Sequence, residues 1–274
     1  MRELVYADDT LLIDSEAENL EIMMQCVADC GQEYGLSYNW SKLEVLCVRC
    51  SVDIRQPNGN VVTKKDSIVY LGALITHDGR SCSELNRRIG LAQVDFLTLQ
   101  TIWGHSTVSR QRKLEIFQAC VVSKLLYGLV AATLNAAERR RLDAFQAWCL
   151  RKIARIPHSY YSRVSNLAVR TMCEQTPLSQ QVVQQQMIYM GKLARRSGTD
   201  LVRSLIFEPN NLTLRQPTGK RRRGRPRQRW GATVIANCLK VAGSQAKLAE
   251  YFCPQDGAEA AWKAVVNESF YRIF

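Results

Sequence analysis

The sequence predicts an α+β protein, in which a small part built from a β-hairpin, a helix and strands precedes an all-α helical bundle and a basic helical tail. Two observations predict this division. Short apolar runs alternate with turn residues as far as residue 79, which favours strands. From residue 80 onward, apolar residues recur at the helical period instead. The expected segments are 1–79, 80–207, a polar linker at 208–229, and 230–274.

A β-hairpin is expected first in the chain. Leu4–Tyr6 and Leu11–Ile13 are short apolar runs, and Ala7–Thr10 between them places two acidic residues at the turn. Ser15 is then expected to cap a helix, with Glu18 completing a capping box.

Strands are expected to follow this helix. Gly35 supplies the helix stop, and β-branched and apolar residues then fill 42–49 and 61–75. The turn residues at 57–60 separate the two strands. Unpaired strand edges would leave an apolar face exposed on Leu4, Leu12 and Val45.

Three amphipathic helices are predicted after residue 80, because apolar residues there recur every three or four positions. Their apolar faces are Leu85, Ile89, Ala92, Phe96 and Leu99; Leu114, Phe117, Val121 and Leu125; and Leu142, Phe145, Cys149 and Ile153. Another helix is expected from Leu178 to Arg196, and Trp230 and Trp262 are expected to anchor the tail.

The net charge of +12 is unevenly distributed along the chain. Residues 1–79 hold 6 basic and 13 acidic side chains, a net of −7, whereas the rest holds 31 basic and 12 acidic side chains, a net of +19. An acidic head before a basic body fits a metal site joined to a nucleic-acid clamp, and a solvated acidic face is the alternative.

The composition predicts an intracellular protein, nuclear or cytoplasmic, without a membrane partner. The first 20 residues include Asp8, Asp9, Asp14, Glu16 and Glu18, whereas a secretory signal needs an apolar stretch there. The longest apolar run, Leu125–Leu134, is about half of the roughly 20 residues that span a membrane. The ten cysteines are expected to be reduced and mostly buried. Helix and strand patterns disfavour a zinc site at Cys26, Cys30, Cys47 and Cys50.

Asp8 and Asp9 are the candidate metal ligands. Carboxylates at a tight turn suit Mg²⁺, which one or two carboxylates usually hold together with substrate phosphates. Two such ions about 3.5–4 Å apart can activate the attacking oxygen and stabilise the leaving oxygen in phosphoryl transfer. Adjacent Asp residues are also common in ordinary turns, so the pair is interpreted with its surroundings.

Three motifs in the first 80 residues resemble those of reverse transcriptases, in the same order. Tyr6-Ala7-Asp8-Asp9 between two apolar runs resembles the catalytic hairpin, and Thr10-Leu11-Leu12 continues it in the manner of non-LTR (LINE-type) retrotransposons. The segment 35–44 resembles the following palm motif, with Leu43 in place of the usual Thr. Val69-Tyr70-Leu71-Gly72 resembles the primer grip.

This resemblance implies a fold and a set of residue roles. Residues 1–79 would form a partial palm, and the helical remainder would be the thumb and carboxy-terminal region. Asp8 and Asp9 would bind catalytic Mg²⁺, with Mn²⁺ as an alternative, and Lys42 would place a proton or positive charge near the departing pyrophosphate. The loop that positions the primer 3′ end would comprise Tyr70, Leu71 and Gly72. The alternative roles are ordinary: a solvated strand edge for Lys42, and packing in a sheet for the primer-grip residues.

The catalytic site that the resemblance implies is incomplete in this sequence. A reverse transcriptase palm has a further metal-binding Asp on an earlier strand, and Met1 lies five residues before Tyr6. We therefore expect a carboxy-terminal fragment of an RNA-directed DNA polymerase that binds Mg²⁺ weakly or not at all and is inactive alone. Whether the chain is itself an enzyme stays open, as do its protein partners and its oligomeric state.

The basic body is expected to bind the phosphates of an RNA template and DNA primer duplex. Basic residues recur on the polar faces of the predicted helices, where ordinary solvation is the alternative. The candidates are Arg87, Arg88, Arg110, Arg112, Lys113, Arg139, Arg140, Arg141, Arg151, Lys152 and Arg155.

The densest basic cluster has seven basic residues in the ten positions 220–229. Its core, Arg223-Gly224-Arg225-Pro226, resembles an AT-hook, so A·T-rich DNA is a further expected partner. A nuclear-localisation patch and a tether are the alternatives. The basic residues are Lys220, Arg221, Arg222, Arg223, Arg225, Arg227 and Arg229.

Two functions from different classes therefore remain. One is the reverse transcriptase of a non-LTR retrotransposon, represented by a fragment. The other is a non-catalytic nucleic-acid-binding protein that uses the basic thumb and tail.

Overall fold

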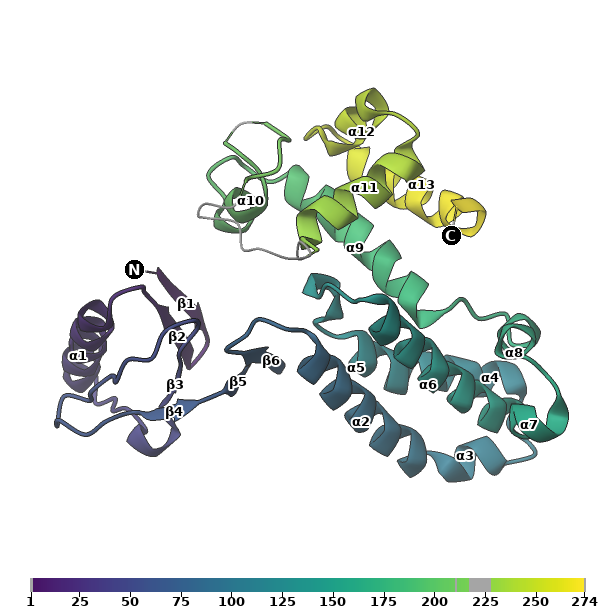
Figure 1. Ribbon diagram of the computed structural model, residues 1–274, viewed down its shortest axis with the longest axis horizontal. Coiled ribbons are helices and arrows are strands. Elements are labelled where there is room, and N and C mark those ends of the chain that lie inside the picture. Colours follow the sequence, from purple (N-terminus) through teal and green to yellow (C-terminus); the bar gives the residue numbers. More distant parts are fainter. Residues whose placement is uncertain (1, 210, 217–227, 274) are drawn as a thin grey trace. The chain divides into compact units, whose positions relative to one another are not determined.

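The computed structural model describes residues 2–209, 211–216 and 228–273. It confirms a mixed α+β protein and divides the chain into two compact units, Met1–Glu84 and Leu85–Phe274 (Figure 1). The described strands belong to the first unit, and the second unit is helical. The segments expected as a helical domain at 80–207 and a tail at 230–274 therefore lie largely in one unit.

The first unit contains three two-stranded sheets and one long helix. β1 and β2 pair in antiparallel, β3 and β4 in parallel, and β5 and β6 in antiparallel orientation. Its elements are β1 (Arg2–Tyr6), β2 (Asp9–Ile13), α1 (Ala17–Glu33), the 3₁₀ turn η1 (Trp40–Lys42), β3 (Glu44–Leu46), β4 (Thr63–Lys65), β5 (Ser67–Tyr70) and β6 (Ala73–Thr76).

The predicted β-hairpin is confirmed with a shorter turn. Ala7 and Asp8 make up the turn, and Asp9 begins β2 opposite Tyr6. Ala7 has a φ of 52°, a left-handed conformation that non-glycine residues adopt uncommonly.

The capping box predicted at Ser15 is wrong. The carboxylate of Asp14 accepts hydrogen bonds from the backbone N–H of Glu16 at 2.9 Å and from the side chain of Asn19 at 3.2 Å. With this Asx turn in place, Glu16 and not Ser15 is the cap residue, so α1 begins one residue later than predicted, at Ala17. The stop is as predicted, since Gly35 follows the helix at a φ of 71°.

The two long strands predicted at 42–49 and 61–75 are shorter in the structure. The first is reduced to β3, because 40–42 forms a 3₁₀ turn. The second is divided into β4, β5 and β6, with Leu71 and Gly72 forming the turn of the β5–β6 hairpin. Their φ values of 46° and 75° are those of a type I′ turn, whose twist matches that of paired strands.

The core of the first unit is small. Met24, Ile54 and Val62 are its buried apolar residues. Of the side chains expected to be exposed, Leu4 is exposed, whereas Leu12 and Val45 are half-buried because they pack against this core.

The second unit comprises helices, and short turns connect those before Ile206 and those after Trp230. Its first group contains α2 (Cys82–Thr98), α3 (Gln100–Gly104), α4 (Arg110–Ile116), the π-helical turn η2 (Phe117–Val122), α5 (Ser123–Leu126), the 3₁₀ turn η3 (Leu129–Ala131), α6 (Ala136–Ala154), α7 (Ser159–Ser162) and α8 (Asn166–Met172). Then follow α9 (Leu178–Ala194), α10 (Leu201–Ile206), α11 (Trp230–Ala242), α12 (Gln245–Phe252) and α13 (Ala258–Ile273).

All three predicted amphipathic faces are confirmed. Their residues are buried or pack half-buried in one hydrophobic cluster formed by α2–α6, α8 and the start of α9. The second face runs through α4, η2 and α5, which follow one another without a break. A π-helical turn adds a residue to the helical repeat, and this lets Phe117, Val121 and Leu125 all face the core at spacings of four.

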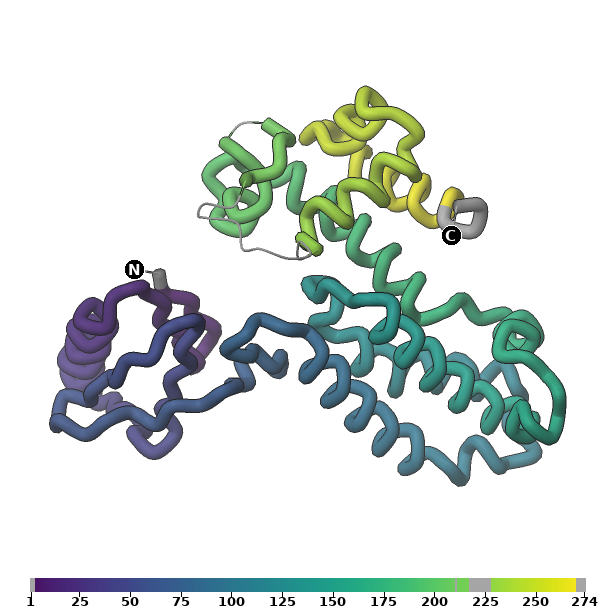
Figure 2. The backbone as a smooth tube through the Cα atoms, viewed as in Figure 1, coloured from purple at the N-terminus to yellow at the C-terminus, as the bar shows by residue number. Residues whose placement is uncertain are grey.

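A second hydrophobic cluster joins α11, α12 and α13 to the carboxy-terminal half of α9. Figure 2 shows α9 passing from the first helical group to this second group. Trp262 is fully buried here, and its indole N–H donates to the carbonyl of Met187 at 2.8 Å. The predicted anchoring role of Trp262 is thus confirmed.

The cysteines are all free, but most are not buried. Buried thiols lie in the second unit, and burial raises the pKa of Cys149 and Cys238, which keeps them protonated. The prediction that most cysteines are buried is wrong, since the buried ones are Cys149, Cys173 and Cys238. In the described parts of the chain, none of the helices is long and apolar enough to cross a membrane.

Candidate nucleic-acid interface and acidic hairpin

Asp8 and Asp9 are both exposed at the β1–β2 turn. Such a turn leaves the carboxylate oxygens accessible to a cation. Within the described residues, however, no group of three or more His, Cys, Asp or Glu side chains could hold a metal ion. The hairpin therefore presents two exposed carboxylates.

The β1–β2 and β5–β6 hairpins, which carry the first and third motifs, are joined by a hydrogen bond. The hydroxyl of Tyr70 donates to the carbonyl of Leu4 at 3.2 Å. Leu71 and Gly72 form the exposed turn immediately after this tyrosine. The turn at Leu71 and Gly72 therefore follows β5, which is hydrogen-bonded to β1 of the acidic hairpin.

The second motif, at 35–44, packs on the small core formed by Met24, Ile54 and Val62. Tyr38 and Trp40 have ring centroids 4.9 Å apart and contact the core with Leu12 and Leu43. Burial, together with the negative charge of Glu3 on β1, raises the pKa of Tyr38. All three motifs therefore contribute to a single compact unit.

Lys42 is exposed at the end of the 3₁₀ turn η1, before β3 begins. The alternative of a solvated strand edge is therefore right about the exposure of Lys42 and wrong about the strand. The 3₁₀ turn is closed by hydrogen bonds from Lys42 N–H to Asn39 and from Leu43 N–H to Trp40. This closure is local, and it explains why the strand starts later than the apolar pattern indicated.

Replacing Tyr70 with phenylalanine tests the connection between the hairpins. Loss of the hydroxyl removes one hydrogen bond from a half-buried side chain, and we expect the unfolding free energy of the first unit to fall by about 0.5–1.5 kcal/mol. Urea unfolding followed by the fluorescence of Trp40 would measure it. Tyr34→Phe, at a tyrosine 79% exposed, is the matched control and should change nothing; equal effects of the two changes would contradict the connection.

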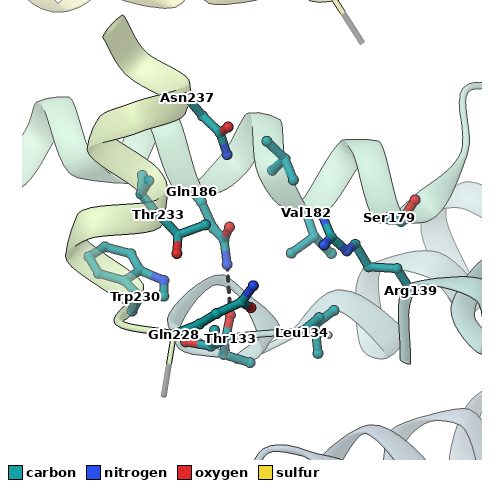
Figure 3. Close-up of a pocket in the computed structure, with 13 residues that line it drawn as sticks. Thr133, Leu134, Arg139, Ser179, Val182, Gln186, Gln228, Trp230, Thr233 and Asn237 are labelled. Carbon is teal, nitrogen blue, oxygen red and sulfur yellow. Dashed lines mark hydrogen bonds between the residues drawn. The ribbon is translucent and has the colours of Figure 1, made fainter. Parts of the chain in front are cut away.

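Arg139, Arg140 and Arg141 are exposed in the first turns of α6. Arg139 lines a hollow in the second unit together with Gln228, Trp230 and Thr233 (Figure 3). Two further lining residues are joined by a hydrogen bond, in which the side-chain amide of Gln186 donates to the carbonyl of Ala132 at 2.8 Å. Arg139 and Gln228, which belongs to the segment 220–229, therefore line the same hollow from opposite sides (Figure 3).

Most of that cluster lies outside the described residues, namely Lys220, Arg221, Arg222, Arg223, Arg225 and Arg227. Arg229 is described and exposed, and its guanidinium donates to the side-chain oxygen of Gln216 at 3.1 Å. The last arginine of the cluster is thus joined to a residue that precedes the cluster.

Trp230 anchors α11, as predicted. Its indole N–H donates to the carbonyl of Val130 at 2.7 Å, and its ring packs half-buried against the second cluster.

Several of the predicted phosphate-binding residues have structural roles instead. Arg88 is buried over the ring of Tyr127, with its guanidinium carbon 4.8 Å from the ring centroid. Lys113 is buried and donates to the carbonyl of His105 at 2.7 Å. Arg155 donates to the carbonyl of Gly104 at 2.6 Å. Burial removes Arg88 and Lys113 from the cations that the folded surface offers to phosphates, whereas Arg155 stays exposed.

Arg151 is buried as well and organises the loop at 157–164, which includes the one-turn helix α7 and which the sequence patterns did not predict. Its guanidinium donates to the carbonyls of Pro157 and Val164 and to the side chain of Asn166. The loop exposes the side chains of Tyr160, Tyr161 and Arg163. One sequence signal could have identified it: between Asp143 and Glu174 the chain has no acidic residue.

Comparison of the chain with models of protein families, with curated proteins and with solved structures found no match in any of the three.

Proposed function

We propose that this chain contributes the end of the palm, the thumb and the basic tail of a non-LTR retrotransposon reverse transcriptase. The observation that carries the proposal is the hydrogen bond between Tyr70 and Leu4. It supports the resemblance because it joins the motif similar to the primer grip to the motif similar to the catalytic hairpin. The packing of 38–43 on the same core supports it further.

On this proposal, Asp8 and Asp9 are two of the carboxylates that hold Mg²⁺ or Mn²⁺ in the assembled polymerase. Two exposed carboxylates without a third acidic neighbour among the described residues do not fit a complete two-metal site. The first unit therefore acts by presenting these carboxylates and the turn at Leu71 and Gly72. RNA-directed DNA polymerisation requires a further acidic ligand.

The function that we propose for this chain by itself is binding to the sugar-phosphate backbone of a template–primer duplex. Arg139, Arg140 and Arg141 are exposed on α6, and the basic cluster follows Gln216 in the sequence. Such contacts give sequence-independent and salt-sensitive affinity. A non-catalytic nucleic-acid-binding protein is the second candidate, and the incomplete carboxylate set favours it.

Primer extension tests both proposals. With an RNA template, a DNA primer and Mg²⁺ or Mn²⁺, we expect the chain to bind the duplex and to incorporate no nucleotide, because the carboxylate set is incomplete. Asp8→Ala and Asp8→Asn should leave duplex binding within about twofold, since a solvent-exposed carboxylate adds little favourable energy to binding a polyanion.

The controls separate the two candidates. Incorporation by this chain that is lost on Asp8→Ala would contradict the incomplete site and establish a polymerase. No duplex binding at low salt would contradict both candidates, because both depend on phosphate contacts.

A further inference from the structure

We propose that the loop at 157–164 is a stacking platform for unpaired nucleotides of RNA or DNA. This inference rests on the proposed nucleic-acid-binding function and adds the form of nucleic acid that one face of the second unit selects. Tyr160 and Tyr161 are 66% and 78% exposed. Their ring centroids lie 5.3 Å apart at an interplanar angle of 87°, so the two rings offer differently oriented faces to solvent.

The loop that presents these rings is held in place from beneath. Arg151 is 8% exposed and donates to the carbonyl of Pro157 at 2.9 Å and to the side chain of Asn166 at 3.1 Å. The hydroxyl of Ser162 donates to the carbonyl of Pro157 at 3.1 Å, which closes the loop on itself. A pre-organised loop loses little conformational entropy when a ligand stacks on it.

The charge around the two tyrosines favours a polyanion over an apolar protein surface. The guanidinium carbon of Arg163 lies 5.4 Å from the ring centroid of Tyr160, where it can contact a phosphate next to a stacked base. The sequence from 144 to 173 contains no Asp or Glu, and its exposed basic residues are Lys152, Arg155 and Arg163. Exposed aromatic rings among cations are the arrangement that binds single strands, because every base has a face that can stack.

Paired and unpaired nucleic acid differ in what they offer this platform. Bases inside a duplex already stack on their neighbours, and only their edges face the grooves. A protruding tyrosine therefore gains most from an unpaired base. Single-stranded RNA and single-stranded DNA share this chemistry, and separate oligonucleotides distinguish them.

The test uses the full chain and a twelve-nucleotide single strand that carries 2-aminopurine, made once as RNA and once as DNA. Stacking on tyrosine quenches 2-aminopurine fluorescence. We expect Tyr160→Ala with Tyr161→Ala to reduce the quenching and to weaken single-strand binding at least about fivefold, at the lower end of the range for one stacked base. Duplex binding should stay within about twofold.

Matched variants isolate the rings. Tyr160→Phe with Tyr161→Phe keeps both faces and should bind as the parent does. Tyr34→Ala removes an equally exposed tyrosine from the acidic unit and should have no effect. Thermal unfolding followed by circular dichroism checks that each variant is folded. If the double alanine variant is unfolded, the quenching and affinity of Tyr161→Ala alone test the inference.

Unchanged quenching and single-strand affinity in the alanine variant would overturn the platform while leaving duplex binding, and hence the proposed function, in place. Absence of binding to any nucleic acid by the parent would overturn both. If the alanine change instead altered sedimentation of the free protein and left oligonucleotide binding intact, the patch would be a protein contact and the inference would be wrong.

Discussion

Trp262→Ala is expected to lower the unfolding free energy of the second unit by about 3–5 kcal/mol. The side chain is fully buried, and it packs edge-on against Phe252 with ring centroids 5.5 Å apart. Its truncation leaves a large cavity and removes the hydrogen bond to the carbonyl of Met187. Guanidinium unfolding followed by circular dichroism at 222 nm would measure the loss.

Two companion variants make this prediction specific. Trp262→Phe keeps part of the volume and should cost less than the alanine change. Gly191→Ala should also destabilise, although alanine ordinarily favours a helix, because its Cβ would lie 2.7 Å from the indole nitrogen of Trp262. A Trp262→Ala protein as stable as the parent would contradict the packing of α13 on α9.

Neutralising the basic cluster should have the largest effect on binding. Changing Lys220, Arg221, Arg222, Arg223, Arg225 and Arg227 to glutamine removes six charges and leaves Arg229, which contacts Gln216, in place. We expect duplex affinity at about 50 mM salt to fall at least a hundredfold, and the slope of log affinity against log salt to decrease by up to about 5. Fluorescence anisotropy across a salt series would show both.

A second pair of changes separates charge from minor-groove insertion. Gly224→Ala with Pro226→Ala keeps every charge but alters the Arg-Gly-Arg-Pro core. On the AT-hook hypothesis, this variant loses its preference for A·T-rich duplex and keeps most of its affinity for other duplexes. A preference unchanged from that of the parent would contradict the hypothesis, and unchanged affinity in the glutamine variant would contradict phosphate binding by the cluster.

Much of the fold could be predicted because periodicity is encoded locally. The three apolar faces of α2, α4–α5 and α6 are visible as spacings of three and four, and the structure buries those residues or packs them half-buried in the core. The β1–β2 hairpin was equally clear. The errors arose where a local hydrogen bond competed with the expected element. The side chain of Asp14, and not that of Ser15, accepts the backbone hydrogen bond before α1, and Lys42 belongs to a 3₁₀ turn instead of the predicted strand.

The candidate site was harder to predict because charge does not reveal the fate of a side chain. Arg139 and Arg151 belong to the same helix, yet Arg139 is exposed and Arg151 is buried as the support of a loop. That difference depends on the path of residues 157–166, which sequence spacing does not specify. The turn at Leu71 could not be predicted from its residue type either, since leucine rarely adopts a positive φ.

The position of α9 couples the stability of the two hydrophobic clusters of the second unit. This helix contributes Leu178 and Val182 to one hydrophobic cluster and Met187 and Met190 to the other, and Asp143 and Gln146 of α6 accept the first backbone N–H groups of α9. The two clusters therefore cannot melt independently without breaking a shared element. If the proposed function holds, a polyanion bound near Arg139 would stabilise both clusters together, and its binding free energy would add to the stability of the whole helical unit.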